Sequence, residues 1–77
     1  MIDMANHRKN IEELENEYHS FREIIYALHN YMEENFLTYD YLVVNNKFGR
    51  GGSIVVAFND GTADSLEMLE LKFRRAE

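Results

Sequence analysis

The apolar residues in the first half of the chain follow a seven-residue repeat. After a first step of seven, they recur at alternating steps of three and four, at Met4, Ile11, Leu14, Tyr18, Phe21, Ile25, Leu28 and Met32. This is the spacing of a coiled-coil helix. Neither glycine nor proline occurs before Gly49 to end it. The pattern predicts one long helix over residues 4–36.

The length of that helix predicts a homodimer. It would run for about 48 Å, whereas a compact chain of this size has a radius of gyration of roughly 11–12 Å. Residues 37–77 of one copy could not cover it, so we expect its N-terminal part to pair with a second copy. The expected interface consists of Met4, Ile11, Leu14, Tyr18, Phe21, Ile25 and Leu28. Opposite charges beside the repeat suit parallel pairing, and antiparallel pairing stays open.

A break in the helix near residues 18–20 is the competing interpretation. It would give two helices folded into a hairpin, although Asn16 and Ser20 are the only turn-forming residues there. From Ile24 onward the apolar stripe widens, because Ile24 and Tyr31 add a second row beside the repeat. A wider stripe is typical of a helix that lies on a sheet.

Two strands are expected after the helix. Residues 39–44 (YDYLVV) and 53–58 (SIVVAF) are rich in β-branched and aromatic types, and the glycine-rich segment 45–52 (NNKFGRGG) lies between them. Both faces of this hairpin are apolar. The helix can cover one face, and the other would need a second chain or a partner protein.

A second turn is predicted at Asp60 and Gly61, and the segment after it is ambiguous. Residues 64–76 alternate like a strand, yet Asp64 and Glu67 could also begin a helix. We prefer the strand. The predicted fold class is therefore α+β, with a long helix followed by an antiparallel hairpin or a three-stranded meander. It forms one domain over residues 1–77, with a dimerising helix at 1–36 and a β-rich part at 37–77.

Composition adds constraints on location and stability. A chain of 77 residues without cysteine has a small core and cannot use disulfides, which again favours association. The lack of cysteine fits a reducing cytoplasm. No run of apolar residues is long enough for a membrane span, and the first residues are too polar for a signal peptide. We expect a cytoplasmic protein.

The charge balance argues against nucleic acid as the main partner. The net charge is −6, and basic residues supply most non-specific affinity for nucleic acid. The glycines of segment 45–52 precede a strand and match no phosphate-binding fingerprint. A basic edge remains as a candidate contact for a partner or an anion, made of Lys47, Arg50, Arg74 and Arg75.

No set of residues points to catalysis, a metal, a cofactor or a small-molecule substrate. Glu15, His19 and Glu23 lie four apart on the expected helix, but they read as a solvated face. His7 occupies a core position of the repeat, either in a frayed end or across a dimer axis.

Ten aromatic residues are many for so short a chain. Tyr18, Phe21, Phe36, Phe58 and Phe73 fall at predicted core positions. Tyr26, Tyr39 and Tyr41 have no clear place in the core, and tyrosines of this kind suit an exposed protein-binding patch.

These observations favour a non-enzymatic module: a small acidic adaptor or regulator that forms a homodimer and binds a further, unidentified protein. The second hypothesis is a small inhibitor of the phage type, whose acidic surface occupies a nucleic-acid-binding protein. The third is a nucleic-acid binder that uses the hairpin tip and the C-terminal basic residues.

Overall fold

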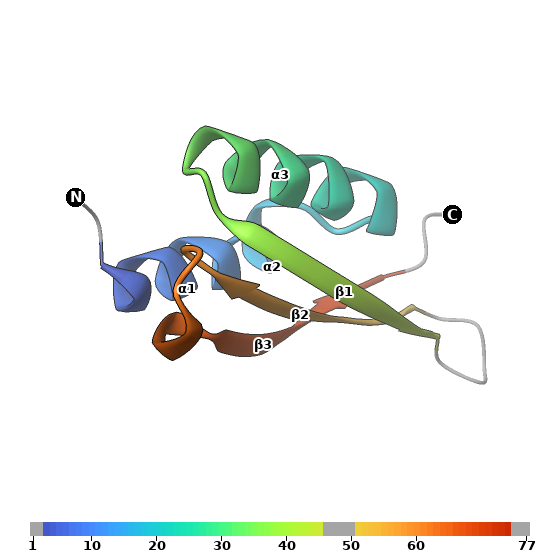
Figure 1. Ribbon diagram of the computed structural model, residues 1–77. Coiled ribbons are helices and arrows are strands. Elements are labelled where there is room, and N and C mark those ends of the chain that lie inside the picture. Colours follow the sequence, from blue (N-terminus) through green and yellow to red (C-terminus); the bar gives the residue numbers. More distant parts are fainter. Residues whose placement is uncertain (1–2, 46–50, 75–77) are drawn as a thin grey trace.

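The computed structural model describes residues 3–45 and 51–74 and shows an α+β fold (Figure 1). Three helices come first and a three-stranded antiparallel sheet follows. The α+β class and the antiparallel meander agree with the prediction, and the single long helix does not. The helices are α1 (Met4–Glu12), α2 (Leu14–Glu17) and α3 (Phe21–Glu34). The strands are β1 (Thr38–Asn45), β2 (Gly52–Asn59) and β3 (Glu67–Phe73), and a short 3-10 turn, η1 (Ala63–Ser65), precedes β3.

In place of the single helix expected over residues 4–36, the chain leaves the helical conformation between Tyr18 and Ser20. Tyr18 is extended, with φ −126° and ψ 143°, and Ser20 is extended as well. The Ser20 hydroxyl accepts the N–H of Glu23 at 3.2 Å and donates to the Glu23 carboxylate at 2.8 Å. This serine therefore caps a new helix, because it satisfies an amide that has no partner within the first turn.

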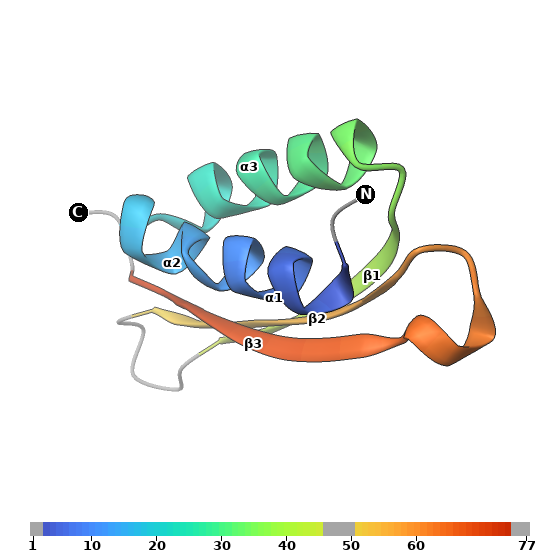
Figure 2. The ribbon, with the colours of Figure 1, turned by 90° about the vertical axis from the view of Figure 1, so that its left-hand side faces the viewer.

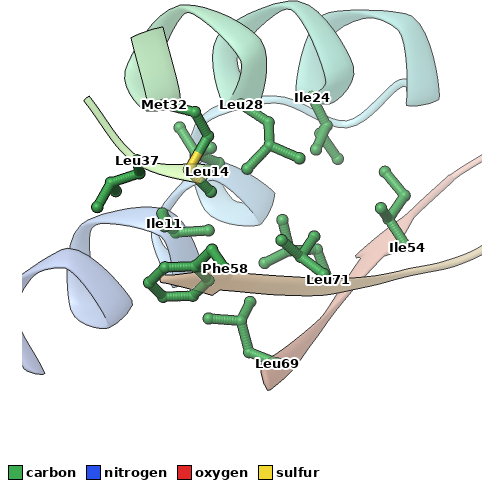
Figure 3. Close-up of a cluster of buried hydrophobic side chains, with 11 residues drawn as sticks. Ile11, Leu14, Ile24, Leu28, Met32, Leu37, Ile54, Phe58, Leu69 and Leu71 are labelled. Carbon is green, nitrogen blue, oxygen red and sulfur yellow. The ribbon is translucent and has the colours of Figure 1, made fainter. Parts of the chain in front are cut away.

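The two helical segments fold back on each other and cover one face of the sheet (Figure 2). Ile11 from α1 and Leu28 from α3, both on the heptad repeat, are fully buried within one chain. Figure 3 shows side chains from the helices pointing toward those of the strands. The core consists of Ile11, Leu14, Ile24, Leu28, Met32, Leu37, Ile54, Val56, Phe58, Leu69 and Leu71. The apolar repeat thus serves packing inside the chain.

The sheet is a meander in the order β1-β2-β3. In the first hairpin Thr38 pairs with Asn59 and Asn45 with Gly52, so each predicted strand is confirmed and extends one residue further at both ends. In the second hairpin Gly52 pairs with Phe73. The strand interpretation of the last segment is therefore confirmed for Glu67–Phe73, whereas Asp64 and Ser65 belong to η1.

The connection from β2 to β3 contains the predicted turn at Asp60 and Gly61. Gly61 has a φ of +99°, a value that L side chains rarely adopt. One oxygen of Asp60 accepts hydrogen bonds from the Ser65 hydroxyl at 2.6 Å and from the Thr62 hydroxyl at 2.7 Å. These two hydrogen bonds, that from Ser65 foremost, lower the pKa of Asp60 below its ordinary value, because they favour the carboxylate.

Helix α3 ends at a strained aromatic residue. Phe36 has a φ of +56°, and its side chain is 89% exposed, which corrects its predicted place in the core. The N–H of Phe36 reaches the Glu33 carbonyl at 3.3 Å and that of Leu37 reaches the Met32 carbonyl at 2.9 Å. This is the Schellman pattern of helix termination, in which glycine normally takes the left-handed position.

Glycine at position 36 should stabilise the protein. A side chain in the left-handed region costs about 1–2 kcal/mol, and the larger backbone entropy of unfolded glycine cancels part of the gain. We expect Phe36→Gly to raise the free energy of unfolding by about 0.5–1 kcal/mol in urea titrations. Phe36→Ala is the control, because it keeps the Cβ and should change stability by less than about 0.5 kcal/mol. A loss of stability in Phe36→Gly would show that the exposed ring stabilises the fold.

Candidate protein-binding surfaces

An apolar surface remains on the side of the sheet away from the helices. Strand residues alternate between two faces, and Ile54, Val56 and Phe58 point into the core. The opposite side, here called the outer face, carries Leu42, Val44, Val55, Ala57 and Met68. Leu42 is 65% exposed and Met68 is 56% exposed. The described helices all lie on the other side (Figures 1 and 2).

Three charged residues lie on the outer face: Asp40 and Lys72 at diagonally opposite corners, and Glu70 beside Val55 on β3. Asp40 lies on β1 beside Ala57, which pairs with Met68 on its other side. Lys72 lies on β3 beside Ser53, which pairs with Val44 on its other side. All three are exposed, and none forms an ion pair in the described part of the chain. Val44, Val55 and Met68 form the apolar diagonal between Asp40 and Lys72.

The edge of the sheet at β3 is closed by the helical segment. Arg8 donates to the Met68 carbonyl at 2.9 Å, and the Lys72 N–H donates to the Glu15 carboxylate at 2.7 Å. The Arg74 N–H donates to the His19 carbonyl at 2.7 Å. A further strand could not pair with β3 unless these contacts were broken.

The edge at β1 is open by comparison. Alternate residues of an edge strand direct their backbone N–H and C=O groups away from the sheet. Tyr41 is one of them, because its N–H meets the neighbouring Asp40 carboxylate at 2.9 Å. The strand TYDYLVVN contains neither lysine nor proline, the residues that commonly block such an edge.

A groove of about 330 Å³ runs between α3 and β1. It contains the three tyrosines that the sequence left without a place in the core. Tyr26 is 66% exposed, and the rings of Tyr39 and Tyr41 are stacked with centroids 6.2 Å apart. The lining residues are Phe21, Arg22, Ile25, Tyr26, His29, Tyr39 and Tyr41. The groove is therefore mainly apolar and aromatic.

Hydrogen bonds fix the polar end of the groove. His29 Nδ1 lies 2.7 Å from the Tyr39 hydroxyl, and His29 Nε2 lies 3.3 Å from the Glu33 carboxylate. Burial, with smaller contributions from the charges of Tyr41 and Glu33, raises the pKa of Tyr39 above its ordinary value. The Tyr39 hydroxyl thus adds a polar group to the groove lining, held in place by its contact with His29.

The residues predicted to form a dimer interface separate into two groups. Ile11, Leu14 and Leu28 are buried in the core of their own chain, and Met4 and Tyr18 pack against it. Phe21 and Ile25 are more accessible and line the groove. Of the predicted basic edge, Arg74 is exposed, and Lys47, Arg50 and Arg75 lie outside the described residues.

The polar residues considered for metal binding or pH sensing are dispersed. Glu15 contacts β3, His19 lies between α2 and α3, and Glu23 belongs to the cap of α3. Over residues 3–45 and 51–74, no three histidine or acidic side chains gather as metal ligands would. His7 is buried inside its own chain, where its Nδ1 lies 2.7 Å from the Tyr31 hydroxyl.

None of the described helices has the length and apolar character needed to cross a membrane. No family model matches the chain, and the comparisons with curated proteins and with solved structures found no match. The outer face, the β1 edge and the adjoining groove are the exposed apolar features of the described residues.

Proposed function

We propose that the protein is a non-enzymatic interaction module that forms a homodimer and presents a further surface to another protein. The observation that carries the proposal is the apolar outer face, which the helices leave bare. Small monomeric proteins rarely expose a continuous apolar patch without using it. A second copy of the chain would cover this patch and add stability to a domain with a small core.

The proposed interface differs from the heptad interface that the sequence predicts. In this fold Ile11 and Leu28 are fully buried in their own chain, so a second copy could not reach them without unfolding the helices. Leu42, Val44 and Met68 are exposed instead. The outer face is therefore the apolar surface that a second copy can cover.

The two corner charges of the outer face, Asp40 and Lys72, complement each other when two copies pack face to face. A two-fold axis along the diagonal of Val44, Val55 and Met68 exchanges the Asp40 corner with the Lys72 corner. Two outer faces packed around this axis have steeply crossing strands, which is the orthogonal type of sheet packing. Asp40 then lies opposite the partner's Lys72. The apolar diagonal is buried between the two copies.

Sedimentation equilibrium tests the dimer directly. We expect twice the mass of one chain for the native protein and the mass of one chain for Met68→Glu, because this change places a carboxylate on the two-fold axis in both copies. Met68 is largely exposed, so circular dichroism should show an intact fold. Asn30→Glu is the matched control: it adds the same charge on the exposed side of α3 and should leave the dimer unchanged. A native protein with the mass of one chain at all concentrations would refute the proposal.

Charge reversal tests the orientation of the two copies. Asp40→Lys or Lys72→Asp alone should raise the dissociation constant about tenfold, because each replaces two attractive contacts by two repulsive ones. The double variant Asp40→Lys/Lys72→Asp should restore affinity close to that of the native protein. If the double variant were as weak as the single variants, the two residues would not face each other.

The acidic surface of the helices supports one alternative. Glu12, Glu13 and Glu17 are exposed on α1 and α2 or between them, and the chain carries a net charge of −6. A surface of this kind could occupy the basic groove of a nucleic-acid-binding protein, as an inhibitor would. Competition between this protein and nucleic acid for a basic target is the assay for it. Loss of inhibition on neutralising these three glutamates would favour the inhibitor over the adaptor.

A further inference from the structure

We propose that the β1 edge and the groove beneath α3 together bind an extended segment of another protein by strand addition. In this mode of recognition an added strand gains affinity from backbone hydrogen bonds and specificity from alternate side chains. The groove lies on the side of β1 opposite the outer face, and the Met68→Glu variant allows the site to be tested in the absence of the homodimer.

The first support is the difference between the two edges of the sheet. On β3, Arg8 bonds to the outward carbonyl of Met68 and Glu15 accepts the outward N–H of Lys72. Just past the strand, the His19 carbonyl accepts the N–H of Arg74. The outward N–H of Tyr41 on β1 meets only the short side chain of the preceding Asp40. An added strand can compete for such a local contact, because it offers a ladder of hydrogen bonds in exchange.

The second support is the position of the groove directly beside this edge. A strand added to β1 would continue the sheet, and every second side chain would point toward α3. These side chains would meet the apolar lining, above all Ile25, Tyr26 and Tyr41. The groove therefore selects large apolar or aromatic residues at alternate positions of the segment.

The third support is a cation at the groove. Arg22 lines it, and no carboxylate in the described residues lies within ion-pair distance of this side chain. His29, the other basic residue in the lining, has its Nε2 3.3 Å from the Glu33 carboxylate. An acidic residue of the bound segment, on the side that faces α3, would pair with Arg22.

This charge argues for a foreign segment and against a second copy of β1. The residues of β1 on the side of α3 are Tyr39, Tyr41 and Val43, none of which is acidic. Self-pairing of two β1 strands would leave Arg22 without a counter-charge. The occupant is thus an extended peptide with large apolar residues at every second position. One of these alternate positions, on the side that faces α3, carries an acidic residue instead.

A display library of random peptides tests the site directly, because it samples many possible segments at once. The expected result is enrichment of sequences with apolar residues at every second position and an acidic residue in the same register. Enriched peptides that tolerate proline throughout, or that show no alternation, would overturn the proposal. The Met68→Glu variant serves as a second bait, because it is expected to be monomeric. It should select the same peptides as the native protein, whether or not the native protein forms a dimer.

Fluorescence polarisation with one enriched peptide then tests each half of the site. Methylating alternate backbone nitrogens of the peptide on the side that faces β1 should weaken binding more than about tenfold, because those N–H groups can no longer donate. Methylation on the opposite side is the matched control. Equal binding of the two methylated peptides would overturn strand addition, and this outcome does not depend on the folding of any protein variant.

Charge exchange tests the role of Arg22. The Arg22→Glu variant should bind the acidic peptide several-fold more weakly than the native protein does. It should bind a second peptide, in which lysine replaces the acidic residue, more tightly than the native protein does. Arg22 is exposed on the first turn of α3, so the fold should persist. If both peptides bound the Arg22→Glu variant as they bind the native protein, the acidic preference would be refuted. If no peptide were enriched, or if β1 were found paired with β1 of a second copy, the foreign segment would be refuted as well.

Discussion

Replacing Ile11 with alanine should lower the free energy of unfolding by about 2–5 kcal/mol. The side chain is fully buried between the helices and the sheet, so the change leaves a cavity that the surrounding core fills only in part. The total stability of a domain of this size is about 5–10 kcal/mol. Urea titration followed by circular dichroism should therefore show a large shift of the midpoint.

Ile25→Ala is the matched control for this prediction. Ile11 and Ile25 are the same residue type at the same position of the heptad, but Ile25 is only partly buried beside the groove. We expect a clearly smaller loss of stability for Ile25. A dimer held by the heptad positions would instead make both changes weaken association. A folded Ile11→Ala variant with half the native mass would contradict the packing described for this residue.

Gly52→Ala should destabilise the protein by about 2–3 kcal/mol, a cost typical of severe overpacking. Gly52 lies in the middle strand and pairs with Asn45 on one side and Phe73 on the other. A Cβ at this position would overlap the carbonyl oxygen of Val44 and press on the Phe73 ring. The strand cannot move away from one neighbour without losing its pairing with the other.

Ser53→Ala is the control for Gly52, because it changes the next residue on the outer face and should alter stability by less than about 0.5 kcal/mol. Thermal unfolding of both variants, with hydrogen exchange of the strand amides, measures the difference. A Gly52→Ala variant as stable as the native protein would mean that Val44 and Phe73 are not held as close to Gly52 as the structure shows. The glycine is thus explained by close backbone approach, with no need for a phosphate ligand.

The strands could be predicted from the sequence because their signals are local. Alternation of Ile54, Val56 and Phe58 with Val55 and Ala57 fixes which side chains share a face. Glycine-containing segments mark both connections. Each of these signals requires only neighbouring residues, and the first two strands agree with them to within one residue. The third strand, predicted over residues 64–76, spans Glu67–Phe73.

The helical part was harder to predict because an apolar repeat does not specify its partner. The same steps of three and four suit a helix that packs on a second chain and one that packs on its own chain. The break at residues 18–20 contains neither glycine nor proline. A signal was nevertheless present: Ser20 followed three residues later by Glu23 and then by apolar residues is a capping box.

The candidate surfaces depend on contacts between residues far apart in the sequence. Arg8 and Met68 are 60 positions apart, and their hydrogen bond is one of those that close the β3 edge. Tyr26, on α3, lines the same groove as Tyr39 and Tyr41, on β1, only because the two elements lie side by side. Sequence patterns could suggest that these tyrosines form a binding patch. They could not predict that the three tyrosines line one groove.

Disulfide cross-linking tests the proposed homodimer most directly, because the native chain contains no cysteine. When Asp40→Cys and Lys72→Cys proteins are mixed under mild oxidation, we expect a covalent dimer containing one chain of each. Each variant alone should remain uncross-linked, since its cysteine would lie opposite an unchanged residue. A mixture of Asn30→Cys and Lys72→Cys should also remain uncross-linked. Absence of the mixed dimer, or equally rapid cross-linking of Asp40→Cys with itself, would contradict the proposed pairing of the outer faces.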